Sequence, residues 1–150
     1  MLRTGALEAH LHQVLIPTYK IRSETLRRVV GEQLGPLGVQ IDTGCPYHLN
    51  VGGGSDREEV IGGFFLYIVF PEGIVADEVA AVALKEYNLR FLAAGMMAVR
   101  GSKSSSGMLS RGARLCWAWE EEEQLVEGVG RLATVLRERF LDRNGYHTSE

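Results

Sequence analysis

The chain has 150 residues, which is the length of one domain and enough to bury a hydrophobic core without disulfides or metals. Apolar residues make up 45% and charged residues 23%, and the formal net charge is -3, so the composition is that of an ordinary globular protein. The sixteen basic residues are spread along the chain and no apolar run could span a bilayer, so we expect one domain over residues 1–150 with no nucleic-acid or membrane partner.

The first element is helical. Apolar residues recur at helical intervals over residues 6–34, with charges between them, which predicts one long helix or two in series. Pro17 removes a backbone donor and crowds the preceding turn, so we expect a kink around residues 15–18. The glycines at 35 and 38 then end the helix, and residues 39–41 alternate as a short strand does.

The middle of the chain contains two expected loops and the strongest strand signal. Residues 42–59 are rich in glycine and polar side chains and predict a mobile surface loop, as do the serines of residues 101–107. Residues 62–71 form an apolar and aromatic run bounded by glycine and proline, which predicts a strand. Residues 75–87 have the pattern of an amphipathic helix.

Two further strands and a helix complete the pattern. Residues 89–93 and 115–119 read as strands, and residues 121–140 read as a helix with acidic residues at its start and arginines near its end. Its apolar stripe is Leu125, Val129, Leu132, Ala133 and Leu136. We therefore predict an α+β fold, a small and mostly antiparallel sheet covered by helices in two layers, with a long kinked N-terminal helix.

Arg114 is the most informative single residue. It precedes the apolar run Leu-Cys-Trp-Ala-Trp, and a guanidinium in that position either reaches water or holds an anion such as a carboxylate. Strand alternation places Arg114, Cys116 and Ala118 on one face, and the bulky Leu115, Trp117 and Trp119 on the other. The bulky face can pack into the core and leave the arginine above small side chains.

Other motifs give no catalytic or metal site. The three glycines at 52–54 lack the ending of a phosphate loop, and His10 and His12 point to different faces of a helix. No nucleophile elbow or zinc-protease motif occurs, so catalytic residues stay unknown. Cys45 and Cys116 are far apart and form no CxxC motif, which favours a reducing, cytoplasmic location.

The order of the segments along the chain carries more information than any one of them. The long helix comes first, followed by the Gly-Gly-Phe-Phe strand that starts at Gly62, a second helix, and the Arg-Leu-Cys-Trp strand that starts at Arg114 before the last helix. Over roughly residues 5–140 this order resembles the C-terminal, small domain of the class I and II aminotransferases. These are the fold-type I enzymes that depend on pyridoxal phosphate.

The resemblance implies a role for four residues. In that family the arginine at the head of this strand binds the α-carboxylate of the amino-acid substrate, and the matching position is Arg114. Gly62, Gly63 and Phe64 match the segment that approaches the substrate pocket. The alternative for the two glycines is structural, since they can let a strand start beside another backbone.

The chain also departs from the family. The large domain that supplies the Schiff-base lysine and most of the cofactor contacts is absent, and Lys103 falls in a loop of the small domain. Ala94-Gly95 replaces the proline and glycine often found after that strand, and the loop at 42–59 is longer than usual. We therefore expect no cofactor site in this chain alone.

Two main hypotheses follow, beside a third in which the chain is a purely structural subunit that caps another protein. The chain is the small domain of a pyridoxal-phosphate aminotransferase, as a fragment, split product or truncated form that is not competent for transamination alone. Alternatively it is a cofactor-free descendant, either a homo-oligomeric binding module or a repurposed enzyme. Both predict a carboxylate-bearing small molecule as ligand, and the protein partner is either a second copy or the missing large domain.

Overall fold

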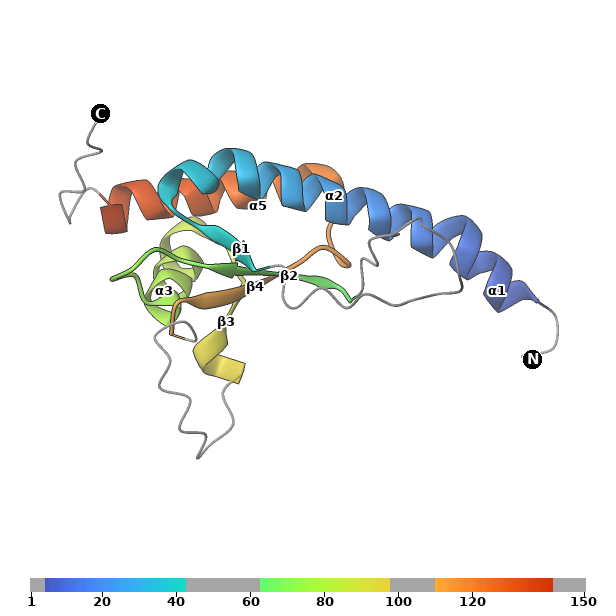
Figure 1. The fold of residues 1–150 in the computed structure, drawn as a ribbon, viewed down its shortest axis with the longest axis horizontal. Helices are drawn as coiled ribbons and strands as arrows, with labels where there is room; N and C mark the ends of the chain where they lie inside the picture. Colours follow the sequence, from blue (N-terminus) through green and yellow to red (C-terminus); the bar gives the residue numbers. More distant parts are fainter. Residues whose placement is uncertain (1–4, 43–62, 98–109, 142–150) are drawn as a thin grey trace, which may run out of the picture.

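The computed structural model describes residues 5–42, 63–97 and 110–141. They form two layers, a four-stranded antiparallel sheet and a layer of helices (Figure 1). Helices α2 (Ile16–Gln33) and α5 (Glu122–Val135) lie side by side, and α3 (Ala76–Tyr87) packs against α5. The α+β class and the long N-terminal helix predicted from the sequence are confirmed.

The sheet has the order β1-β2-β4-β3. Its strands are β1 (Gln40–Asp42), β2 (Phe65–Val69), β4 (Gly112–Cys116) and β3 (Leu92–Ala93), and each neighbouring pair is antiparallel. Side chains alternate between the two faces. Leu66, Ile68 and Leu115 are buried under the helices, whereas Phe65 and Arg114 are exposed on the other face. The sheet therefore has one covered face and one open face.

The N-terminal helix is continuous but irregular. The π-helical segment η1 (Leu11–Leu15) joins α1 (Ala6–His10) to α2. The sequence predicted a kink at residues 15–18, and the structure instead places the irregular turn just before Pro17. Proline donates no bond to the carbonyl of Gln13 and its ring crowds that turn, so the disturbance falls on the N-terminal side.

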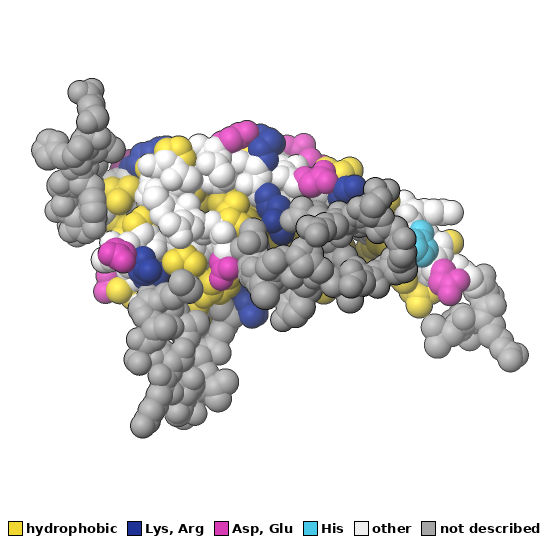
Figure 2. All heavy atoms as spheres, viewed as in Figure 1, with side chains coloured by type: hydrophobic (Ala, Val, Ile, Leu, Met, Phe, Trp, Pro, Cys, Tyr) yellow, Lys and Arg dark blue, Asp and Glu magenta, His cyan; other side chains and the backbone are white. Residues whose placement is uncertain are grey.

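The two halves of this helix have different surroundings. In its C-terminal half Leu26, Val29 and Val30 are buried against α5 and the sheet. In its N-terminal half five apolar side chains are between 38% and 55% exposed, and Figure 2 shows hydrophobic side chains beside the histidine at that end. The exposed set is Leu7, Leu11, Val14, Ile16 and Ile21.

Helix ends are fixed by local signals. α3 ends at Asn88, which has the left-handed φ of 48° that asparagine tolerates. α5 starts with a capping box, in which the Glu121 amide donates to the Gln124 side-chain oxygen at 3.2 Å. Its predicted apolar stripe is buried as expected, and the π-helical segment η4 (Leu136–Leu141) continues it.

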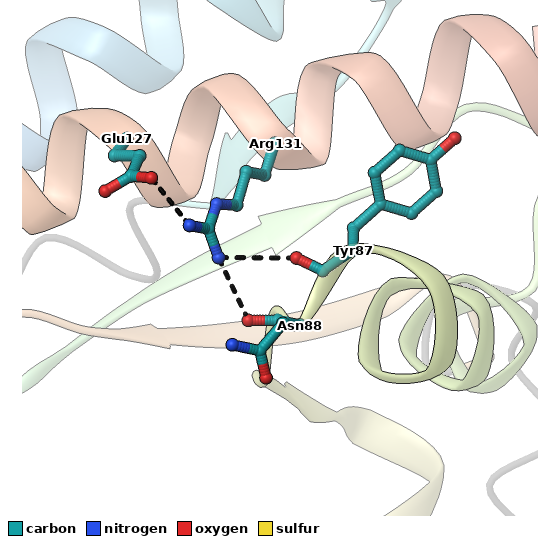
Figure 3. Close-up of polar contacts among 4 residues, drawn as sticks. All are labelled: Tyr87, Asn88, Glu127 and Arg131. Atoms are coloured by element: carbon teal, nitrogen blue, oxygen red, sulfur yellow. Dashed lines mark hydrogen bonds and ion pairs between the residues drawn. The ribbon is translucent and has the colours of Figure 1, made fainter.

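Arg131 ties α5 to the end of α3 (Figure 3). One guanidinium nitrogen donates to the carbonyl oxygens of Tyr87 and Asn88 at 3.3 and 3.2 Å, and the other pairs with Glu127 at 2.6 Å. These carbonyls are left without helical partners at the end of α3, so the arginine satisfies them and fixes where the chain leaves the helix.

Two boundaries differ from those predicted. The strand expected over residues 115–119 lies at Gly112–Cys116, so Arg114 is in its middle, and Trp119 is 85% exposed rather than in the core. The strand expected over residues 89–93 is confined to β3. Asp42 ends β1, while the rest of the loop predicted at 42–59 and the loop at 101–107 lie outside the described residues. Within those residues no helix is long and apolar enough to cross a membrane.

Candidate functional site

Arg114 occupies the centre of the open face of the sheet. The register places Tyr67 directly opposite it on β2 and Leu92 opposite it on β3, and Asp42 of β1 is opposite Tyr67. These four side chains therefore form one row across all four strands. Since neighbouring strands are about 4.8 Å apart, the backbones of Asp42 and Arg114 are about 10 Å apart.

The Arg114 side chain is exposed and forms no ion pair with a described residue. Its guanidinium carbon lies 5.6 Å from the centre of the Phe65 ring, a cation–π contact worth about 0.5–1 kcal/mol at an exposed site. Arg22 and Arg131, by contrast, pair with glutamates and donate to backbone carbonyls. No described residue makes a hydrogen bond or ion pair with the Arg114 guanidinium, so its planar fork of donors can accept an anion.

Tyr67 forms the wall of the site beside Arg114. Its ring lies over Gly112, where a β-carbon would be 2.5 Å from the ring carbon Cζ, so glycine is required for this packing. Burial raises the pKa of the Tyr67 phenol above its usual value of 10.0, the Asp42 carboxylate raises it further, and the Arg114 guanidinium lowers it. The phenol is thus a neutral hydrogen-bond donor near pH 7.

The structure does not bring all the predicted site residues together. Phe64 packs edge to face on Tyr19 of α2, with ring centres 5.6 Å apart, and lies on the opposite face of the strand from Phe65. Gly63 is exposed with a φ of 85°, and Gly62 lies outside the described residues. The roles proposed for these three residues stay predictions. The neighbours of Arg114 that the sequence did not reveal are Phe65, Tyr67 and Leu92, and Asp42 lies beyond Tyr67 in the same row.

The described residues do not form a cradle for pyridoxal phosphate. Such a cradle needs an amine for the Schiff base, and the two described lysines, Lys20 and Lys85, are exposed on α2 and α3. Neither lysine lines the cavity beside Ile74 and Arg111 or the cavity beside Leu26 and Leu125. Lys103 lies outside the described residues, which also contain no group of three potential metal ligands.

Comparison with known proteins places this fold. The sequence matches no protein-family model and no curated protein. Solved structures of aminotransferases do match. The α-aminoadipate aminotransferase LysN of Thermus thermophilus has 22% identity and a TM-score of 0.64, over 91% of this chain and 28% of its own. The chain has the fold of part of a fold-type I aminotransferase.

Two other matches agree. The multiple substrate aminotransferase of Thermococcus profundus has 25% identity and a TM-score of 0.64, over 89% of this chain and 27% of its own. The kynurenine aminotransferase of Pyrococcus horikoshii has 21% identity and a TM-score of 0.62, over 91% and 28%. The resemblance drawn from the order of the motifs is confirmed at the level of the fold, and the chain spans little more than a quarter of these aminotransferases.

Proposed function

We propose that this chain is the carboxylate-recognising part of an aminotransferase-related protein, as a fragment, split product or truncated form. The observation that carries the proposal is Arg114, whose guanidinium is exposed, lacks a partner among the described residues and is oriented by Phe65. The structure of LysN contains N-(5'-phosphopyridoxyl)-L-leucine, so a protein with this fold holds a ligand that bears a carboxylate. Arg114 would bind such a group through two parallel hydrogen bonds.

The proposal assigns binding to this chain and leaves transamination to the complete protein. Transamination needs a cofactor as electron sink and a base at the reacting carbon. The pyridoxal phosphate and its lysine would come from a large domain that lies outside these 150 residues. The thiol of Cys116 is free and exposed, which fits the cytoplasmic location that we expect for this protein.

A titration of the labelled chain tests the role of Arg114. The probes are 4-methylpentanoate and its uncharged amide, which have the same shape, and the readout is the arginine side-chain Nε–H resonances in NMR. We expect the carboxylate to shift the Arg114 resonance with a dissociation constant in about the millimolar range, and the amide to have no effect.

Two variants make this test specific. Arg114→Gln should abolish the response, and Arg137→Gln, which removes another exposed arginine, should preserve it. Arg114→Lys should bind several-fold more weakly because an ammonium group lacks the planar fork. An equal response to the amide, or the same loss in the Arg137 variant, would refute carboxylate recognition by Arg114.

The alternative proposal is a homo-oligomeric module that covers its exposed surface with a second copy. It is favoured by the apolar N-terminal half of the long helix, where Leu7, Val14 and Ile21 are each about half exposed. Sedimentation velocity separates the two proposals. A dimer at micromolar concentration that Val14→Glu dissociates supports the module, whereas a monomer that binds a separately expressed large domain supports the aminotransferase fragment.

A further inference from the structure

A cavity, separate from the open face around Arg114, lies at the edge of the sheet opposite β1. This cavity of about 320 Å³ opens between α5, the end of β4 and the segment that leads into β3. Its floor is apolar and includes Leu26, Leu125 and Leu132, which are at most 6% exposed. Arg90, Glu120 and Trp119 stand at its rim. The cavity therefore reaches from solvent into the core, at a size suited to one or two apolar side chains.

The backbone beside this cavity has an unpaired strand edge. Trp117 donates its amide to the Phe64 carbonyl at 3.1 Å, and Phe70 donates to Arg111 at 2.9 Å, so the odd-numbered residues of β4 bond to β2. The even-numbered residues therefore direct their N–H and C=O groups toward β3, where Arg114 meets Leu92.

Cys116 is the next even-numbered residue, and the register places Arg90 opposite it. Arg90 lies outside β3, and no backbone hydrogen bond joins Cys116 to it or to any other described residue on that side. One donor and one acceptor of the central strand are thus free at the mouth of the cavity. A backbone edge of this kind can pair with an added strand.

Arg131 and Trp119 define two sides of the surroundings of the cavity. Arg131 binds the carbonyls of Tyr87 and Asn88, which fixes where the chain leaves α3 and enters residues 89–91 (Figure 3). Trp119 is 85% exposed at the rim, so its indole is available to cover a ligand. Tryptophan in such a position contributes strongly to protein contacts.

We propose that this cleft binds an extended peptide segment of another polypeptide, which pairs with the Cys116 backbone and inserts an apolar side chain into the cavity. The alternation of side chains along a strand determines which peptide residue enters the cavity. The peptide residue opposite Cys116 lies with its side chain on the open face, and the residue next to it points inward, toward Leu115 and α5. Backbone pairing gives affinity and the cavity selects the inserted side chain, as in other cases of strand addition.

The test uses a defined peptide, acetyl-Lys-Val-Thr-Leu-Thr-Val-Lys-amide, whose central leucine is meant for the cavity. The Cys116 amide and the Trp119 indole N–H are followed by NMR up to ~1 mM peptide, a range suited to a single inserted side chain. We expect saturable shifts of both signals. N-methylation of the two threonines should weaken binding about three- to tenfold. Serine in place of the leucine should weaken it by about tenfold or more.

Matched variants of the protein locate the site. Gly128 lines the cavity and a β-carbon there meets only Leu89, at 3.6 Å, so Gly128→Leu should fill the space and abolish binding. Gly130→Leu, two residues along the same helix and outside the cavity, should preserve it. Circular dichroism verifies that both variants fold, and Gly128→Ala replaces the larger change if Gly128→Leu does not.

Several results would overturn the proposal. These are the absence of binding at 1 mM, equal binding of the N-methylated peptide, or shifts confined to residues 7–21. Shifts of Cys116 and Trp119 that grow with protein concentration alone would identify a second copy as the occupant, and equal shifts with 4-methylpentanoate would identify a small-molecule pocket.

Discussion

Gly112→Ala tests the packing on which the open face depends. A β-carbon at residue 112 would lie 2.5 Å from Cζ and 3.1 Å from Cε1 of Tyr67, and the hydroxyl oxygen would be closer still. The ring must therefore move. Overpacking of this kind costs about 1–3 kcal/mol, and loss of a strand glycine returns about 0.5–1 kcal/mol, so the middle of the two ranges gives a net loss of about 1 kcal/mol in the free energy of unfolding.

A double-mutant cycle isolates the contact. Urea unfolding, followed by circular dichroism, measures Gly112→Ala in the native background and in Tyr67→Thr, where the ring is gone. In the second background the alanine should be neutral or stabilising, which gives a coupling energy of about 1 kcal/mol or more. Gly31→Ala is the control, because a β-carbon there meets nothing within 4 Å, and it should stabilise the helix by about 0.5–1 kcal/mol. A neutral Gly112→Ala, or a loss that Tyr67→Thr does not relieve, would show that the ring does not lie on Gly112.

Three further predictions concern Tyr67 and the two tryptophans. Asp42→Asn should lower the pKa of Tyr67 and Arg114→Gln should raise it, because the carboxylate disfavours tyrosinate and the guanidinium favours it. Titration of the tyrosine Cζ chemical shift measures both pKa values, and a change of the same sign in the two variants would contradict this prediction. Since the folded-state pKa of Tyr67 is raised, its contribution to the free energy of unfolding is complete below pH ~10 and is lost as the pH rises further. Tyr67→Phe should remove this pH dependence. Trp117→Ala should cost about 3–5 kcal/mol of unfolding free energy and Trp119→Ala less than about 0.5, as urea unfolding would measure, because Trp117 is 2% exposed and Trp119 85%.

The sequence predicts the two faces of the strand that contains Arg114, but it does not predict where this strand ends. Alternation correctly separates Arg114 and Cys116 from Leu115 and Trp117, since these residues lie in or beside a regular strand. It fails at Trp119 because the strand ends at Cys116 and the chain bends toward the start of α5. Local periodicity carries no information on where a strand stops when apolar residues continue beyond it.

The neighbours of Arg114 could not be predicted in the same way. Asp42, Tyr67 and Leu92 are each more than twenty residues away in the chain, and they meet Arg114 or its neighbour only through the strand register. A change of register by one residue would exchange the two faces, and the local pattern does not fix which residue is opposite which. Phe65 rather than Phe64 contacts the arginine for this reason, because Phe65 has the required parity, and the substrate-pocket role of Phe64 stays a prediction.

Arg114 alone cannot give tight binding, and this connects the open face to a need for a partner. A dissociation constant in about the millimolar range corresponds to only about 4 kcal/mol of binding free energy, because the freedom of motion lost on association offsets most of what an exposed guanidinium gains. The same hydrogen bonds strengthen once water is excluded, because the effective dielectric constant falls. The described surface around Arg114 is open, with Phe65 and Leu92 still about half and one third exposed, and we propose that a second polypeptide covers it. A carboxylate affinity that rises by orders of magnitude when a second polypeptide binds would therefore identify the partner that completes the site.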